Sequence, residues 1–336
     1  MQHGLKYSAL RQSRIPESPP VVPPLEHGER RPRWSVMIPV YNCSQYLEAV
    51  LDSVLCQDEG PSRMQIEVID DGSTDADVEE IVMRKGKGRV GYFRQAENLG
   101  SLRNFHTCLL RARGELVHLL HGDDIVRSGF YRKMGELFDS YPAIGAAFCR
   151  YAYIDEKGKF LYHHEAEMDR DGIPGNWLQR LCERQRIQYV AMVVKREVYE
   201  RLGGFYGVEY GEDWEMWVRI AARYQMAYTP DVLAEYRRHY SSISGKTFVT
   251  ARNMDCLRWV MERVAEYLPR EEAGSVSRAS RSFYAHYALR VANTLWTKFK
   301  HRRGASAQAL AAWRMSRDAG LLYKIIKLYT RITFNV

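Results

Sequence analysis

The sequence predicts an α/β fold whose sheet is mostly parallel and flanked by helices. Short apolar runs rich in β-branched residues alternate, over roughly the first third of the chain, with stretches whose apolar residues recur at helical spacing. This alternation is typical of strand–helix–strand units, in which helices cover the faces of a parallel sheet. Because 336 residues exceed the size at which one core usually stops growing, we also expect a further region after the α/β domain.

The composition limits the class of protein. Hydrophobic residues make up 46% of the chain and charged residues 27%, which is ordinary for a globular protein, and no apolar run approaches the length of about 18 residues that marks a membrane span. Residues 1–32 lack the apolar centre of a secretory signal and are rich in proline and charge, so we expect a flexible leader. The six cysteines form no CxxC pair, which favours reduced thiols and a cytoplasmic location.

Three strand–loop–helix units follow the leader. Each strand is a short apolar run, and each helix shows apolar residues at a spacing of three and four. We expect Thr74 or Asp75 to cap the second helix and Gly114 to close the third. In chain order, the predicted strands are residues 34–40, 64–69 and 89–94, and the predicted helices span residues 44–57, 76–85 and 102–112.

A fourth predicted strand, residues 115–120, ends just before two adjacent carboxylates, Asp123 and Asp124. Carboxylates at the carboxyl end of a parallel strand suit a divalent cation whose remaining ligands are phosphate oxygens. A structural alternative is that one of them caps the helix that begins near Ser128.

The loops after the earlier strands carry polar residues at the same predicted edge of the sheet. Asp70 and Asp71 open a loop that is either a simple turn or a site whose carboxylate accepts a hydrogen bond from the ring N–H of a base. Asn98 precedes a helix whose first turn contains Arg103 and Asn104, and a helix N-terminus with such donors favours phosphate. Taken together, these loops indicate a nucleotide site.

Two later segments also carry ionisable residues. The apolar spacing of Trp214, Trp217 and Val218 predicts a helix that begins with Glu212 and Asp213. These carboxylates either complement the helix dipole or include an exposed general base at the rim of a pocket. Farther on, His239 follows two arginines, Arg237 and Arg238, at the end of an apolar strand, and such arginines are suited to holding phosphate.

These segments together resemble the inverting family 2 glycosyltransferases, over roughly residues 34–245. The resemblance depends on six motifs in the family's order, and their combination is specific. Residues 36–42 resemble the opening strand and V-P-x-Y-N loop, 68–75 the V-x-D-D-G-S-x-D motif, 98–100 the N-x-G motif, 122–124 the DxD-type metal motif, and 203–205 and 212–214 the GGF and ED segments.

The resemblance implies a GT-A catalytic domain over residues 33–245. Such a domain binds a nucleoside-diphosphate sugar, here of the UDP or dTDP type, together with Mn²⁺ or Mg²⁺, and it transfers the sugar with inversion. The positions that match the family's nucleotide-binding residues are Pro39, Tyr41, Asp70, Asp71, Asn98 and Arg103.

The resemblance also implies roles for the remaining polar residues. Asp123 holds the metal, and His239 approaches the metal or the diphosphate. His121 stands where the family usually has the first aspartate of DxD, and an imidazole is a better ligand for manganese than for magnesium. Asp213 is the base that deprotonates the acceptor hydroxyl, with Glu212 and Trp214 beside the acceptor.

The resemblance fades beyond residue 245, and residues 246–336 are predicted to form a helical C-terminal region. In residues 321–333, one face carries Lys324, Lys327 and Arg331, opposite Leu322, Ile325, Ile326 and Tyr329. This helix either packs on the protein with its lysines in solvent or docks on an anionic membrane at the inner face of the plasma membrane, as a peripheral protein.

We therefore expect a metal-dependent hexosyl- or deoxyhexosyltransferase that extends a cell-surface glycan or glycolipid, as in polysaccharide biosynthesis. The alternative is a nucleotide-sugar-binding scaffold without chemistry, to which the histidine in the metal motif points. The net charge of +8 alone would permit nucleic-acid binding. The basic residues are spread along the chain rather than clustered, and no aromatic-rich recognition motif is present, so we expect no nucleic-acid partner.

Overall fold

The computed structural model describes residues 14–26, 31–239 and 247–334. The chain divides into two compact units. The expected boundary near residue 245 falls outside the described residues, and the domain limits remain a prediction. The first unit comprises Met1–Gly175, Ile187–Gly207 and Ile220–Arg238, and the second comprises Asn176–Arg186, Val208–Arg219 and His239–Val336.

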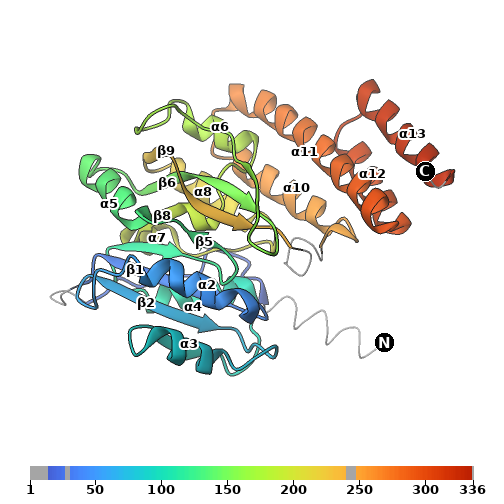
Figure 1. Cartoon of the computed structure of the whole chain (residues 1–336). Helices are drawn as coiled ribbons and strands as arrows, with labels where there is room; N and C mark the ends of the chain where they lie inside the picture. Colours follow the sequence, from blue (N-terminus) through green and yellow to red (C-terminus); the bar gives the residue numbers. More distant parts are fainter. Residues whose placement is uncertain (1–13, 27–30, 240–246, 335–336) are drawn as a thin grey trace. The chain divides into compact units, whose positions relative to one another are not determined.

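The first unit is built on one mixed sheet (Figure 1). Its first four strands along the chain run parallel, as predicted, whereas β8 runs antiparallel to both of its neighbours. The strands lie in the order β3 (Gly91–Arg94), β2 (Met64–Asp70), β1 (Trp34–Val40), β4 (Leu116–Leu119), β8 (Met192–Lys195), β6 (Ala146–Ile154), β9 (Met226–Arg237) and β5 (Ile125–Val126), and β7 (Phe160–His163) pairs with β6.

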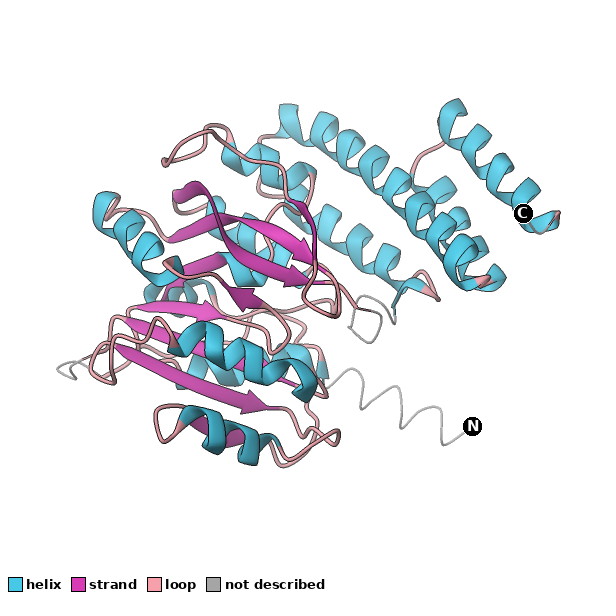
Figure 2. Cartoon of the chain, in the orientation of Figure 1, coloured by secondary structure: helices cyan, strands magenta, loops and turns pink. Residues whose placement is uncertain are grey.

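Helices cover both faces of this sheet (Figure 2). The chain moves outward from β1 to β2 to β3 and then returns to β4, so right-handed crossovers place α2 and α3 on one face and α4 on the other. All of β1 is buried, because a strand covered on both faces meets no solvent. The helices of this unit are α2 (Ser44–Leu55), α3 (Val78–Gly86), α4 (Ser101–Arg111), α5 (Phe130–Ser140) and α7 (Arg196–Leu202), with a 3-10 turn, η1 (Tyr189–Ala191).

Two local expectations were wrong. The cap of α3 is Asp77, whose carboxylate accepts a hydrogen bond from Glu80 N–H at 3.0 Å. Gly114 does not close α4, which ends with Ala112 in an extended conformation. Instead, Gly114 lies so close to β1 that an added Cβ would meet the backbone carbon of Trp34 at 2.5 Å.

Residues 14–26 of the expected leader lie against the first unit. Val22 is buried, and the carbonyl of Pro20 accepts a hydrogen bond from Gly204 N–H at 2.8 Å. Arg196 donates to the carbonyl of Pro23 at 3.0 Å. This segment therefore gains its order from contacts with the folded unit, although its own composition predicts none.

The second unit is helical in its described part (Figure 1). Trp177 at the start of α6 is buried, which is the usual fate of a large aromatic residue. Among the described residues, no helix combines the length and apolarity needed to span a bilayer. The helices are α6 (Trp177–Glu183), α8 (Glu212–Ala221), α10 (Arg252–Ala265), α11 (Arg270–Phe299), α12 (Arg302–Met315) and α13 (Ala319–Thr333).

The final helix, α13, does not bury the apolar face expected from the sequence. Its buried residues are Leu321, Ile325, Leu328 and Ile332, a stripe at helical spacing. Of the residues predicted to form the apolar face, only Ile325 is among them. Leu322, Ile326 and Tyr329 are exposed on a second surface of the same helix.

Candidate metal and nucleotide site

The loops predicted to form the site all leave the same edge of the first unit's sheet. Strands β3, β2, β1 and β4 are parallel neighbours, so their carboxyl ends lie together. The register places Val40 beside Asp70 and Asp70 beside Arg94. The sequence correctly predicted this shared edge.

The loops after β1 and β2 are joined by hydrogen bonds. Asn42 donates its backbone N–H to Ser73 Oγ at 3.0 Å, and its side-chain oxygen accepts from Thr74 N–H at 2.8 Å. Asp75, once considered as a helix cap, accepts instead from Ser44 N–H at 2.9 Å, at the start of α2. These bonds hold the two loops in one fixed arrangement.

Asp70 is fully buried and both of its carboxylate oxygens have partners. Oδ1 accepts from Ser73 N–H at 2.8 Å, whereas Oδ2 accepts from the Tyr92 hydroxyl at 2.9 Å and from Arg94. Arg94, which the sequence did not single out, also donates to the carbonyl of Ser73 at 2.8 Å. Asp70 therefore organises the loop, and its predicted contact with a base remains a prediction.

Asp71 joins this loop to the one that follows β3. Its two oxygens accept from the N–H groups of Leu99 and Gly100 at 2.7 and 2.9 Å. Asn98 donates back to the carbonyl of Asp71 at 3.1 Å. Burial raises the pKa of Asp71 despite these bonds. At Gly72, where φ is +74°, an added Cβ would lie 3.3 Å from Asn98 N, so the close approach of the loops favours glycine.

The other predicted nucleotide residues differ in exposure. Pro39 is buried within β1, and its carbonyl accepts from Gly122 N–H at 3.1 Å. Tyr41 is 46% exposed and Arg103 is exposed in the first turn of α4. Asn104, by contrast, is buried and donates to the carbonyl of Ile69 at 2.9 Å, so it holds α4 against the sheet.

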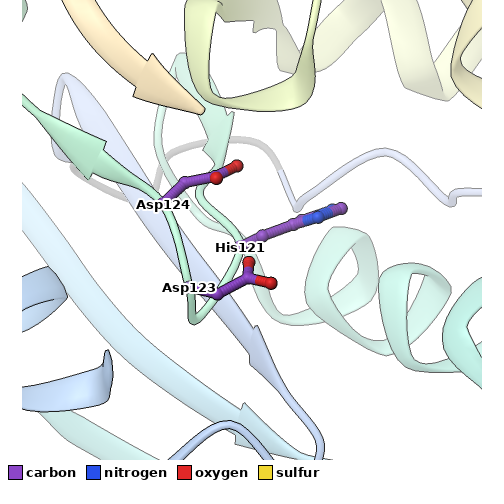
Figure 3. Close-up of side chains that lie close together, drawn as sticks. All are labelled: His121, Asp123 and Asp124. Carbon is purple, nitrogen blue, oxygen red and sulfur yellow. The ribbon is translucent and has the colours of Figure 1, made fainter. Parts of the chain in front are cut away.

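The loop after β4 carries three potential metal ligands. His121, Asp123 and Asp124 each offer one ligand atom, and these atoms lie within 4.8 Å of one another. Figure 3 shows the three side chains leaving the same short loop toward the same side. Helix α5 begins at Phe130 after Gly129, without any side-chain cap. The alternative that Asp123 or Asp124 caps this helix is therefore wrong.

The close spacing of two carboxylates in this group favours a bound cation, whose charge would offset theirs. Burial and the neighbouring charge of Asp123 raise the pKa of Asp124, whose Oδ2 is buried and has no hydrogen-bond partner among the described residues. Burial lowers the pKa of His121, so its imidazole is neutral, which is the form that binds metals. Its Nε2 is also buried and without a hydrogen bond in this part of the chain. A nitrogen and carboxylate oxygens form a donor set for a divalent metal.

Aromatic side chains fix the imidazole of His121. The ring stacks on Phe105 of α4 at 5.1 Å between centroids and lies against Tyr189 of η1 at 4.3 Å. Phe105 and Tyr189 are separated from His121 and from each other in sequence, so no local pattern could have predicted these two ring contacts. At Gly122, an added Cβ would meet the side chains of Val40 and Cys43 at 2.8 and 2.9 Å, so the loop requires glycine there.

Arg237, at the end of β9, holds the same loop from the other side. Its backbone N–H donates to Asp124 Oδ1 at 2.8 Å, and its Nε donates to the carbonyl of Asp123 at 2.7 Å. The guanidinium also lies 4.6 Å from the ring centroid of Tyr46. The sequence suggested a phosphate ligand here, whereas the buried Arg237 is used to position the metal loop.

Asp213 lies in the second unit, at the start of α8. It is buried rather than exposed, so the expectation of an exposed base was wrong. Burial raises its pKa from 3.8 to about 7, although Trp214 N–H and the side-chain amide of Gln185 both donate to it. Such a value suits a general base near neutral pH. Gln185 was missed because a single glutamine in a loop carries no signal.

The neighbours of Asp213 differ from expectation. Trp214 is fully buried, donates from Nε1 to the carbonyl of Leu181 at 2.6 Å, and packs on Tyr284 at 5.1 Å. The indole anchors the helix, and its predicted contact with the acceptor remains a prediction. Glu212 is also buried, and His239 is the first residue of the last segment of the second unit. The roles predicted for Glu212 and His239 remain predictions.

Comparisons with known proteins agree with this geometry. The family model described as glycosyl transferase family 2 matches residues 35–203, just over half of the chain. An uncharacterized protein of Mycobacterium tuberculosis is 29% identical over 238 residues, which cover 67% of this chain and 73% of the relative. An uncharacterized glycosyltransferase of Mycoplasma genitalium is 34% identical over 131 residues, or 38% of this chain and 43% of the relative.

Solved structures show the same fold at low sequence identity. The crystal structure of residues 1–349 of S. aureus TarS in complex with UDP-GlcNAc has a TM-score of 0.60 and 15% identity, and the match covers 89% of this chain and 90% of that one. The mannosyltransferase PcManGT from Pyrobaculum calidifontis, in complex with GDP-Man and Mn²⁺, has a TM-score of 0.50 and 18% identity, with 98% and 94% covered. At such identities, the likeness concerns the fold alone.

Proposed function

Since the chain belongs to glycosyl transferase family 2 and has a GT-A fold, we propose that it transfers a hexose or deoxyhexose from a nucleoside-diphosphate sugar to a hydroxyl group of a glycan or lipid-linked acceptor. The transfer proceeds by a single displacement that inverts the anomeric carbon. The donor is of the UDP or dTDP type.

The observation that carries this proposal is the arrangement of His121, Asp123 and Asp124. Their ligand atoms lie together at the sheet edge where α/β proteins bind nucleotides, and His121 Nε2 and Asp124 Oδ2 are buried without a hydrogen-bond partner in the described part of the chain. Buried polar atoms without partners are costly, and binding a cation would remove that cost. A Mn²⁺ or Mg²⁺ ion held by these residues would supply positive charge to offset the charge that develops on the leaving diphosphate.

The neighbouring loops supply the nucleotide contacts in this proposal. Tyr41 is exposed beside the fixed loop of Asp70 and Asp71, and its ring is free to stack on a base. Arg103, in the first turn of α4, places a positive charge where the helix N-terminus already favours phosphate. Pro39 and Asn98 are the remaining nucleotide-binding residues in this proposal.

Asp213 acts as the base in this mechanism. Its raised pKa leaves it able to accept the proton of the acceptor hydroxyl as that oxygen attacks, and the amide of Gln185 orients the carboxylate. Glu212 borders the acceptor, and His239 completes the metal or diphosphate contacts.

The experiment that tests the proposal is release of nucleoside diphosphate from a panel of nucleotide sugars, with Mn²⁺ and with Mg²⁺. We expect turnover of a UDP- or dTDP-sugar that is lost in Asp123→Ala and in Asp213→Asn. Donor binding without turnover under every combination of metal and acceptor would instead support the scaffold function, to which His121 in the metal motif points.

We also propose that α13 docks the protein on an anionic membrane at the inner face of the plasma membrane. Outside its buried stripe, the helix exposes Tyr323 and Ile326, which are 68% and 56% exposed, beside Lys324 and Lys327. Exposed apolar residues with flanking lysines are typical of helices that lie in the interface of anionic bilayers. Docking there would bring a lipid-linked acceptor to the enzyme.

A further inference from the structure

Three tyrosines lie side by side across strands β7, β6 and β9 of the first unit. Tyr153 of β6 is in register with Tyr162 of β7 and with Tyr236 of β9. The ring centroid of Tyr153 is 4.5 Å from that of Tyr162 and 5.7 Å from that of Tyr236. Since residues opposite each other on paired strands share a face of the sheet, these three form one row, which we call the tyrosine row.

The tyrosine row is accessible at its outer end. Tyr162 is 46% exposed on β7, which in the described sheet pairs with β6 alone. Arg238 donates to the Tyr162 hydroxyl at 3.1 Å, and its guanidinium lies 5.9 Å from the ring centroid of Tyr153. The rings are thus held in place before any ligand binds, which lowers the entropic cost of binding.

The tyrosine row is linked to the metal loop through intermediate residues of the first unit. Tyr153 lies 5.4 Å from Tyr151 between ring centroids. Tyr151 is hydrogen-bonded to the side chain of Gln188, which directly precedes η1. The first residue of η1 is Tyr189, whose ring lies against His121. Contacts between side chains, together with the peptide bond from Gln188 to Tyr189, therefore link the candidate metal site to the exposed ring of the row.

The chemistry of the row suits carbohydrate. A sugar ring has an apolar face of C–H groups and an edge of hydroxyls, and a tyrosine offers an apolar ring with a polar hydroxyl. Several such rings in line can contact successive units of one chain. A small alcohol is too short to contact a surface that extends over three strands, whereas a glycan of several units can contact all of it.

We propose that the tyrosine row binds the acceptor glycan, contacting sugar units beyond the one that receives the transferred sugar. This assignment rests on the proposed function and adds the acceptor class, which is an oligosaccharide or polysaccharide several units long. The row determines which acceptor is held, whereas the loops at the strand edge hold the donor.

Binding to a printed array of defined tri- to hexasaccharides, without nucleotide sugar or metal, tests the row. Wild-type protein is expected to bind a subset of these glycans. Tyr162→Ala should weaken that binding by about tenfold, because a stacking ring is lost. Tyr162→Phe, which keeps the ring, retains most of the binding. The matched control is Phe160→Ala, which removes a similarly exposed ring on the same strand, in register with Ile154 rather than with Tyr153.

Absence of binding to every oligosaccharide, or an equal loss in Tyr162→Ala and Phe160→Ala, overturns this inference. Thermal midpoints that match wild type confirm that both variants are folded. In transfer assays, Tyr162→Ala raises the KM for acceptor and leaves kcat and metal-dependent UDP binding unchanged. If the protein binds glycans but turns over no nucleotide sugar, the proposed transferase activity is refuted and the glycan-binding role of the tyrosine row is retained. The two proposals can therefore be refuted independently.

Discussion

Arg237 binds only one of the two carboxylate oxygens of Asp124. The backbone N–H of Arg237 binds Oδ1 of Asp124 at 2.8 Å, while Oδ2 remains buried without a hydrogen-bond partner in the described residues. One oxygen is fixed to the protein, and the other is left for a ligand. The last residue of β9 thereby sets the position of a loop more than a hundred residues earlier in the chain.

This relationship makes Arg237 a positioning residue for metal binding. Arg237→Ala removes the donors to the carbonyls of Asp123 and Asp155 and the contact with Tyr46, so the metal loop loosens. We expect weaker Mn²⁺ binding by calorimetry and a loss of stability of about 1–3 kcal/mol. The control, Arg238→Ala, changes the exposed neighbour and leaves both properties near wild type. Equal effects of the two changes would contradict the role of Arg237.

Replacing His121 tests the metal preference. His121→Asp exchanges an imidazole for a hard oxygen ligand, so activity with Mg²⁺ relative to Mn²⁺ should rise. His121→Asn serves as the control, because it removes the imidazole without adding a charge. The measurement is the ratio of donor turnover rates in the two metals. A ratio that stays the same in both variants shows that His121 does not contact the metal.

The buried carboxyl of Asp213 predicts a dependence of activity on pH. Only the deprotonated form accepts a proton, so kcat/KM should rise with pH until it levels off above about 7. Asp213→Asn should lower kcat by about 10²- to 10⁴-fold and abolish this rise, with donor binding preserved. Asp255→Asn, at an exposed position of α10, is the control. An unchanged pH profile in Asp213→Asn would exclude the base role.

The same carboxyl also affects stability. Its pKa in the folded protein lies above its ordinary value of 3.8, so between about pH 4 and about pH 7 the folded chain binds more protons than the unfolded chain. The contribution of Asp213 to the free energy of unfolding is therefore largest below pH 4 and is lost as pH rises toward about 7. Urea unfolding measured across this range should show that the free energy of unfolding falls less, as the pH rises, in Asp213→Asn than in wild type.

Charge reversal on α13 tests membrane docking. Lys324→Glu combined with Lys327→Glu should abolish sedimentation with phosphatidylserine vesicles at low salt, because each lysine near such a surface contributes about 1 kcal/mol. Reversal of Arg278 and Arg281, which are exposed on α11, supplies the control. Equal loss in the two double variants would mean that binding follows net charge rather than the α13 surface, and no binding by wild type would exclude docking.

Local patterns predicted the first half of the sheet well. The run of β-branched residues in β1 was predicted with its observed bounds, and β2 with its observed start, because buried parallel strands are short and apolar throughout. The shared edge of the loops followed from the alternation of strands and helices. The resemblance to a family then assigned roles to residues on that edge.

The parts of the fold and of the candidate site that were not predicted depend on contacts between residues distant in sequence. Nothing near Arg237 shows that it reaches the loop of Asp123, and nothing near His121 reveals the ring of Tyr189. The burial of Asp213 could not be read from a polar residue at the start of a helix. For α13, helical spacing allowed two apolar stripes, and packing selected the one that contains Leu321 and Leu328.

The most direct test of the central claim is calorimetric titration of UDP and of dTDP into wild-type and Asp123→Ala protein, each with and without Mn²⁺. We expect wild type to bind at least one of these nucleotides far more tightly with Mn²⁺ than without it, and we expect Asp123→Ala to lose this metal dependence. Equal affinities in all four combinations of protein and metal would contradict a nucleotide-sugar site built on the metal loop.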